Sequence, residues 1–273
     1  MKKLIIIADW AEDTLARQEV RSAVEGYLKN HNGGNISFIY STPSSIHTAF
    51  LVKQIVEIEE RFGKPLETVI FQNTDPRLHS DHALKKAEGA KPLILRLKSG
   101  LYITGPNASY NFSLVKNRIE EVFEYAGLTI QGQFHSRDLY ARIAAHLMDE
   151  QEDEMDLEEV SSTLIPELSG LYIGHIDNFG NIKTLIKHSY LKGKYEYGEQ
   201  IDITINGIHK KVRYVESLFG SEPGELVIYP GSAGSNDDRY LEISIWRHFT
   251  EDKPTTGLHE FNFPKPGNPV DIK

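Results

Sequence analysis

The sequence has no cysteine among its 273 residues. Disulfide bonds and thiolate chemistry are therefore excluded, and the absence favours a reducing compartment, so we expect a cytoplasmic protein. No apolar run approaches the ~18 residues of a membrane-spanning helix, and we expect no membrane partner. The opening stretch, MKKLIIIADW, has an apolar run of only four residues. That run is too short for the core of a secretory signal peptide.

Positively charged residues are also outnumbered, with 30 lysines and arginines against 39 acidic residues. The formal net charge is -9, and no cluster of lysine and arginine offsets it. Most of the surface would repel a phosphate backbone, so we expect no nucleic-acid partner. The sequence also lacks GxSxG, Walker A and GxGxxG motifs, which excludes the standard hydrolase nucleophile and the standard phosphate-binding loops.

The first half of the chain alternates apolar runs with helical periodicity. Hydrophobic residues make up 40% of the sequence and charged residues 25%, as in ordinary globular proteins. The spacing predicts four strands, the first three buried on both faces, and four helices. The strands are expected at residues 4–7, 36–40, 68–71 and 93–97, and the helices at 16–28, 46–62, 113–126 and from about 136. This alternation predicts right-handed crossovers and an α/β domain whose sheet is mostly parallel and flanked by helices.

The pattern changes at an acidic stretch, residues 149–160. Seven of its first ten residues are acidic, which favours a solvated linker. Short strands separated by glycine-bearing turns follow it, and they predict an antiparallel, barrel-like β domain. We therefore expect an α/β nucleoside-binding domain over residues 1–155 and an antiparallel β domain over residues 156–273. The proline-rich end of the chain is expected to wrap over the surface or to fray.

Polar residues follow the predicted strands of the first domain. In a parallel sheet the carboxyl ends of the strands meet at one edge, where ligands bind. The residues expected at this edge are Asp9, Asp13, Ser41, Thr42, Asp75, His79, His82 and Asn107. Their convergence predicts a binding site there.

Each of these residues also has a simpler interpretation. Asp9 could cap the helix that follows it, and Asp75 before Pro76 could only form a turn. His79 and His82 could be solvated, and His135 could only begin a helix. Together with Asp75, these three histidines would make a plausible metal-ligand set, but their spacing matches no closed zinc pattern. We therefore expect no metal.

Several motifs resemble the S-adenosylmethionine (SAM) hydroxide adenosyltransferase family, relatives of the bacterial fluorinase and chlorinase. The segment FHSRDLYARIAAHL is similar to a family FHGRDxFAPxAAHL, and DNFGN matches DxFGN. The order ADW, TDP, GPN and LEIS extends the resemblance over nearly the whole chain. It implies an α/β domain followed by a β-barrel domain, no cofactor beyond SAM as the substrate, and a homotrimer. Each site would lie between the first domain of one subunit and the second domain of the next.

The resemblance also implies roles for individual residues. Asp9 would accept both ribose hydroxyls, since a carboxylate has lone pairs for a vicinal diol. Asp13 and Asp177 would face the methionine ammonium, and Asn181 would bind the adenine edge. Asn107 would belong to the substrate-binding set, in a GPNAS segment where GPDNG is usual.

The catalytic set implied by the resemblance is Asp75, His82 and His135, which would hold the attacking water. This part of the sequence departs from the family, which has glycines after the Asp-Pro pair and an arginine where His82 stands. Three functions follow as alternatives. The main one is hydrolysis of SAM to adenosine and methionine. The second is a non-catalytic protein that binds adenosine or SAM, and the third is a metal-dependent hydrolase of another nucleoside.

Overall fold

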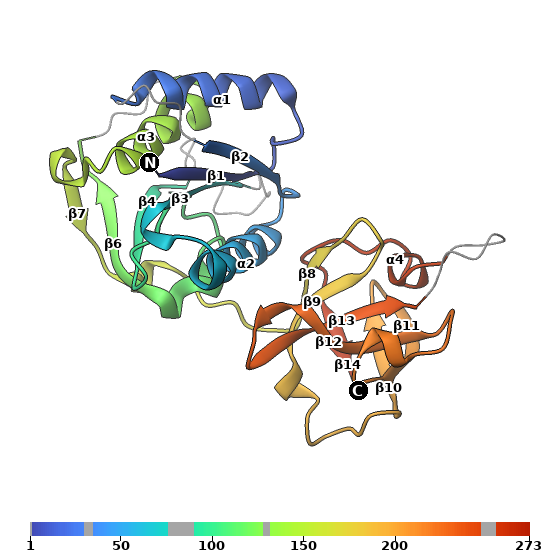
Figure 1. Ribbon diagram of the computed structural model, residues 1–273. Helices are drawn as coiled ribbons and strands as arrows, with labels where there is room; N and C mark the ends of the chain where they lie inside the picture. Colours follow the sequence, from blue (N-terminus) through green and yellow to red (C-terminus); the bar gives the residue numbers. More distant parts are fainter. Residues whose placement is uncertain (1, 30–34, 76–89, 128–131, 247–254) are drawn as a thin grey trace. The chain divides into compact units, whose positions relative to one another are not determined.

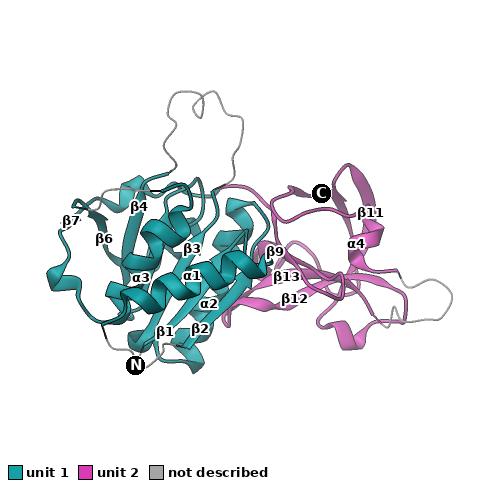
Figure 2. Ribbon diagram, turned by 90° about the horizontal axis from the view of Figure 1, so that it is seen from above, with its two compact units in different colours: residues 1–168 teal, residues 169–273 magenta. Residues whose placement is uncertain are grey.

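The computed structural model describes residues 2–29, 35–75, 90–127, 132–246 and 255–273. The chain divides into two compact units, Met1–Leu168 and Ser169–Lys273 (Figure 2). This division falls later than the boundary predicted near residue 155. Within the described residues, no helix is both long and apolar enough to cross a membrane.

The first unit is built on a seven-stranded sheet in the order β2-β1-β3-β5-β4-β6-β7. Strands β2, β1, β3 and β5 are parallel, whereas β4, β6 and β7 are antiparallel to their neighbours. Its elements are β1 (Lys3–Ala8), α1 (Thr14–Tyr27), β2 (Asn35–Tyr40), α2 (Ser45–Phe62), η1 (Pro65–Glu67), β3 (Thr68–Asn73), β4 (Pro92–Leu97), β5 (Tyr102–Pro106), η3 (Ser113–Arg118), β6 (Ile119–Tyr125), the π-helical turn η4 (Ser136–Tyr140), α3 (Ala141–Met148), η5 (Glu152–Glu154), β7 (Leu157–Glu159) and η6 (Ser162–Leu164).

Helices cover both faces of this sheet. Figure 1 shows α1 and α3 on one face and α2 on the other. The alternation of strand side chains explains the arrangement, because Leu4 and Ile6 of β1 pack in one core cluster with Val20 of α1 and Leu147 of α3. The predicted mostly parallel α/β sheet is confirmed.

Three expectations for the first unit are wrong in detail. Strand β2 is not buried on both faces, because among the described strands it lies at the edge of the sheet, beside β1. The helix predicted at 113–126 is a short 3-10 helix followed by strand β6, which pairs with β4. The acidic stretch is not a solvated linker, because Met155 is buried in the core and β7 pairs with β6. In the last two cases pairing in the sheet overrides the local sequence signal.

The second unit is a seven-stranded sheet in the order β14-β10-β11-β12-β13-β9-β8. All neighbouring strands are antiparallel except β11 and β12, which are parallel. Its elements are β8 (Ile173–Ile176), β9 (Ile182–Lys187), η7 (His188–Tyr190), β10 (Gln200–Ile205), β11 (Ile208–Tyr214), η8 (Leu218–Gly220), β12 (Leu226–Ser235), β13 (Asp238–Ile245), α4 (Gly257–Glu260) and β14 (Val270–Ile272).

The two edges of this second sheet meet. Tyr172, just before β8, forms an antiparallel bridge with Pro269, just before β14, and the N–H of Ile173 donates to the carbonyl of Asn268 at 2.9 Å. The sheet is therefore a nearly closed barrel, as the sequence predicted. The end of the chain neither frays nor lies loosely on the surface: Phe261 is fully buried, and β14 pairs with β10.

Candidate functional site

The carboxyl ends of the parallel strands meet at one edge of the first sheet. Ala8 at the end of β1 is in register with Tyr40 of β2 and with Asn73 of β3. The backbone N–H of Asp9 donates to the carbonyl of Asn73 at 3.3 Å. Asp9 therefore lies directly beside the segment that leads to Asp75, and both residues follow strand ends at the same edge of the sheet.

A chain of buried hydroxyl groups links the ends of β2 and β3. The Ser41 and Thr48 hydroxyls are 2.8 Å apart, and the Thr48 hydroxyl donates to Thr74 Oγ1 at 2.7 Å. All three residues are fully buried. Because each hydroxyl has a partner in the chain, burial of the group is compensated and the segment before Asp75 is fixed.

A pair of buried amides links β3 to β5. Asn111 Nδ2 donates to Gln72 Oε1 at 2.9 Å and to the carbonyl of Thr74 at 2.7 Å, while Gln72 Nε2 donates to the carbonyl of Pro106 at 2.7 Å. Gly105 has a φ of +150°, and a Cβ there would collide with the carbonyl oxygen of Gln72. Glycine at this position therefore allows the close approach on which the amide pair depends.

Asp9 and Asp13 have different environments. Asp9 is half-buried in the turn after β1, and its charge adds to the effect of burial and of Glu12 in raising the pKa of Tyr40. Asp13 is the N-cap of α1, and its Oδ1 accepts from the N–H groups of Leu15 at 2.8 Å and Ala16 at 3.2 Å. The helix cap that the sequence allowed for Asp9 is thus provided by Asp13.

Asp75 lies two residues beyond β3 and is exposed, with its Oδ2 accepting from the N–H of Ala90 at 3.3 Å. His135 is half-buried and immediately precedes the π-helical turn Ser136–Tyr140. The last residue of that turn, Tyr140, stacks on Phe71 of β3 with ring centroids 5.4 Å apart. Burial raises the pKa of Tyr140, and the charge of Asp75 raises it further. The π-helical turn that follows His135 thus packs on the strand that leads to Asp75.

Asn107 follows β5 at the same edge. Its backbone N–H donates to the carbonyl of Lys91 at 2.9 Å, and its Nδ2 donates to the carbonyl of Leu164 at 3.0 Å. Its Oδ1 is buried without a hydrogen-bond partner among the described residues. His79 and His82 lie outside the described residues. Within the described part of the chain, no three histidine or acidic side chains gather as a metal site would require.

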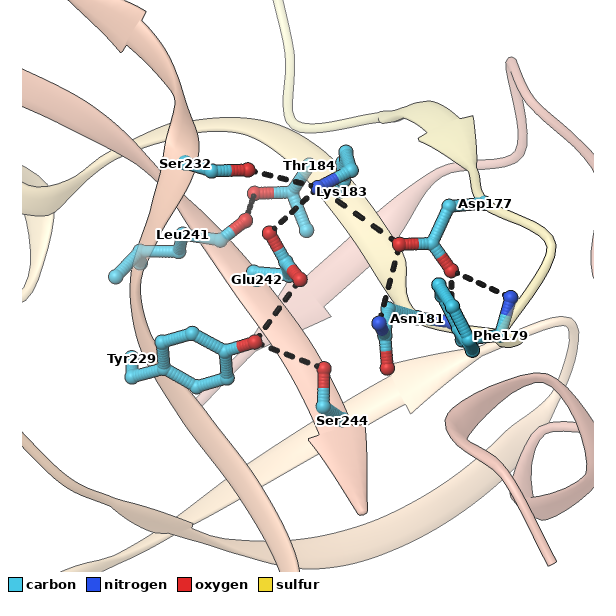
Figure 3. A network of polar contacts seen from close by, with 10 residues as sticks. All are labelled: Asp177, Phe179, Asn181, Lys183, Thr184, Tyr229, Ser232, Leu241, Glu242 and Ser244. Carbon is cyan, nitrogen blue, oxygen red and sulfur yellow. Dashed lines mark hydrogen bonds and ion pairs between the residues drawn. The ribbon is translucent and has the colours of Figure 1, made fainter. Parts of the chain in front are cut away.

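In the second unit, Asp177 and Asn181 occupy the turn between β8 and β9. Asp177 Oδ1 accepts from the N–H groups of Phe179 at 2.9 Å and Asn181 at 3.1 Å, and its Oδ2 accepts from Asn181 Nδ2 at 3.0 Å. Figure 3 shows the two side chains facing each other, with Phe179 beside them. The turn holds both polar side chains in place and leaves the Phe179 side chain 60% exposed.

A buried ion pair lies behind this turn. Lys183 Nζ is 2.9 Å from Glu242 Oε2 and 3.9 Å from Asp177 Oδ2, and it donates to Ser232 Oγ at 3.0 Å (Figure 3). Glu242 Oε1 accepts from the Tyr229 hydroxyl at 2.9 Å. Burial, followed by the charge of Glu242, raises the pKa of Tyr229.

His175 on β8 belongs to the same surroundings. Burial lowers its pKa, and the positive charge of Lys183 lowers it further, while Asp177 and Glu242 act in the opposite direction. The imidazole is therefore held towards its neutral form. The turn between β8 and β9 thus lies beside two carboxylates (Asp177 and Glu242), the ammonium group of Lys183 and a histidine whose pKa is lowered, His175.

The sequence interpretation missed several residues of these networks. Lys183 and Glu242 gave no usable signal, because β9 and β13 contain other polar residues and only the register of the two strands brings this pair together. Gln72 carried a usable signal, because it is a polar residue directly after the apolar run of β3. Asn111 gave no signal, since it lies in a loop and meets Gln72 only after β3 and β5 have paired.

Comparison with known proteins adds similarity to a family over part of the chain and a shared fold over nearly all of it. The model of the SAM hydroxide adenosyltransferase C-terminal domain matches residues 171–247. A relative from Methanocaldococcus jannaschii, named (R)-S-adenosyl-L-methionine hydrolase, is 30% identical over 160 residues. That match covers 56% of this chain and 58% of the relative, so the chain spans little more than half of the relative's length.

Two solved structures share the fold over essentially the whole chain. An uncharacterized conserved protein from Thermotoga maritima has a TM-score of 0.72 and 18% identity, covering 98% of this chain and 99% of that one. A conserved hypothetical protein from Thermus thermophilus has a TM-score of 0.64 and 18% identity, covering 100% of both. At this identity the two structures establish the fold alone. The family model and the archaeal relative, by contrast, show that parts of this chain are similar in sequence to proteins named for SAM chemistry.

Proposed function

We propose that the protein hydrolyses SAM to adenosine and methionine. The family model and the archaeal relative that it matches in part are both named for SAM chemistry, and one observation carries the finer assignment. Asp9, the segment leading to Asp75 and the turn that begins at His135 all pack around the ends of β1 and β3. Such a cluster provides carboxylates for a ribose diol together with an acid–base pair for a water molecule.

The reaction requires little from a general acid. The oxygen of water forms a bond to ribose C5′ while the C5′–S bond breaks. The electron pair of the broken C5′–S bond goes to sulfur. The sulfonium becomes the neutral thioether of methionine, and the water loses one proton. The site must therefore align the water with the C–S bond, exclude other solvent and accept the proton. We assign water alignment and proton removal to Asp75 and His135, with His82 as the third member of the set.

Substrate binding is assigned to the remaining predicted residues. Asp9 accepts the ribose hydroxyls, Asp13 and Asp177 face the methionine ammonium, and Asn181 pairs with adenine. Asn107 contributes to the same set through its Oδ1, which has no partner among the described residues. Following the family resemblance, we propose that Asp177 and Asn181 act in the site of a neighbouring subunit of a homotrimer, and that no cofactor or metal is needed.

A non-catalytic binding protein is the second candidate. It is favoured by Arg77, Leu78 and His79, which stand where the family has glycine-containing sequence after the Asp-Pro pair, and by His82 in the arginine position. Side chains in place of glycine restrict how closely backbone can approach a ligand. Such a protein would bind adenosine or SAM without turning SAM over.

The deciding experiment is incubation of the purified protein with SAM in H₂¹⁸O, followed by mass spectrometry. Both sulfonium epimers are assayed separately, because the name of the archaeal relative specifies the R form. Hydrolysis at C5′ predicts methionine and adenosine with one ¹⁸O atom in adenosine. Tight binding of adenosine without its release from either epimer would leave the binding protein as the function. Assays with and without EDTA test the independence from metal, and light scattering tests the trimer.

A further inference from the structure

Trp10 connects two parts of the proposed catalytic site: the turn after β1, which carries Asp9, and the turn that begins at His135. It follows Asp9 directly in sequence, and its indole meets the ring of Phe134 edge-to-face with centroids 5.7 Å apart and planes at 80°. Phe134 in turn directly precedes His135. The indole also meets the ring of Phe38 of β2, with centroids 6.2 Å apart and planes at 66°.

The Asp9 side of this contact is held by the backbone. The N–H of Asp9 donates to Asn73, the N–H of Ala11 donates to Ala8 at 3.3 Å, and the N–H of Asp13 donates to the carbonyl of Trp10 at 2.9 Å. None of these hydrogen bonds uses the indole. Loss of the ring would therefore leave the position of Asp9 largely unchanged.

On the His135 side, ring contacts of side chains join the π-helical turn to the strands and turns around it. The carbonyl of Phe134 accepts from the N–H groups of Arg137 at 3.0 Å and Asp138 at 2.9 Å, so Phe134 and His135 move with the π-helical turn. The far end of this turn is packed on β3 through Tyr140 and Phe71. Its near end meets the turn after β1 through the Trp10–Phe134 ring contact.

We propose that Trp10 is a positioning residue, which sets the place of His135 relative to Asp9 through its edge-to-face contact with Phe134. This inference rests on the proposed function for its kinetic consequence. Edge-to-face contacts restrict ring orientation as well as separation, because the positive ring edge faces the negative ring face. An aliphatic residue of similar apolar character fills space without that restriction.

The test uses two substitutions of Trp10 and one matched control. Trp10→Leu removes the ring, whereas Trp10→Phe keeps an aromatic edge for Phe134. Phe38→Leu removes the other aromatic contact of the same indole and leaves the Phe134 contact intact. For each variant we would measure kcat and KM for SAM, the melting temperature, and the imidazole resonances of His135, assigned by their loss in His135→Gln.

We expect Trp10→Leu to lower kcat about tenfold or more, because a misplacement of about 1 Å can cost on the order of 10²-fold in rate. Its KM should stay within about threefold, since Asp9 is held independently. Trp10→Phe should recover most of kcat. Phe38→Leu should lower the melting temperature but keep kcat within about threefold. The His135 resonances should shift in Trp10→Leu more than in Phe38→Leu.

Equal losses of kcat in Trp10→Leu and Phe38→Leu, or no recovery in Trp10→Phe, would overturn the positioning role. If the wild type releases no adenosine, the proposed hydrolysis fails by itself, and the His135 resonances then decide this inference. Unmoved resonances in Trp10→Leu would refute it.

Discussion

Lys183 Nζ lies 2.9 Å from Glu242 Oε2, and neither side chain is more than 16% exposed. Removing one partner of a buried ion pair leaves an uncompensated charge, which costs more than the pair contributes. We expect Lys183→Met to lower the free energy of unfolding by about 3–5 kcal/mol. In a Glu242→Gln background, which keeps an acceptor for Tyr229, the same substitution should cost clearly less. Urea denaturation of the wild type, the two single variants and the double variant measures the coupling between Lys183 and Glu242. Strictly additive losses of unfolding free energy would contradict it.

Asp9→Ala should weaken adenosine binding at least about tenfold, because loss of a hydrogen bond to a charged group costs about 1.5–3 kcal/mol. Glu12→Ala is the matched control, since Glu12 is an exposed carboxylate in the same turn. Both variants remove a negative charge near Tyr40. Calorimetry with adenosine should therefore separate them, and equal affinities for the two variants would deny Asp9 its role at the ribose.

Asp13 combines an observed structural role with a proposed role in binding. Asp13→Ala removes the N-cap of α1 and should lower the free energy of unfolding by about 0.5–2 kcal/mol. Asp13→Asn keeps an equally good cap but loses the charge. If Asp13 faces the methionine ammonium, Asp13→Asn should retain the melting temperature and bind SAM more weakly, with adenosine affinity unchanged. Wild-type affinity for SAM in Asp13→Asn would leave the helix cap as its whole role.

The stability of the protein should fall as the pH drops below about 6.5, the ordinary pKa of histidine. Burial and Lys183 lower the pKa of His175 in the folded state. Between the folded and unfolded pKa values the unfolded chain binds more protons, so lowering the pH favours unfolding. Urea denaturation at pH 7.5 and pH 5.5 should show a smaller difference for His175→Asn than for the wild type. The same difference in both proteins would exclude His175 as the source.

Hydrolysis should decline towards alkaline pH if His82 supplies positive charge to the catalytic set. Its protonated fraction falls as the pH passes its pKa, whereas an arginine stays charged. His82→Arg should therefore raise the rate at pH 8–9 and flatten the profile measured as adenosine release from pH 6 to pH 9. An unchanged profile would remove His82 from the catalytic set.

The fold could be predicted where local pattern and tertiary environment agree. The buried strands β1 and β3 are nearly continuous apolar runs, and the change to short strands marks the barrel. Strand β6 could not be predicted, because its glutamates and aromatic residues also fit a helical period. Only its pairing with β4 makes this segment a strand. Of the site, Asp9 and Asp75 were predictable from their positions after strands. The Asn111–Gln72 contact and the Lys183–Glu242 pair depend on strand register, which the sequence does not reveal.

The closure of the barrel by β14 affects the order in which the protein can fold during synthesis. The first unit contains all the partners of its own sheet within residues 1–168. Domains generally fold as units, the earlier one first, as a chain emerges from the ribosome. The second unit cannot join its two sheet edges until Asn268 and Pro269 reach Ile173 and Tyr172. Until these late residues have been made, strands β10 and β8 therefore form two unpaired edges of the second sheet.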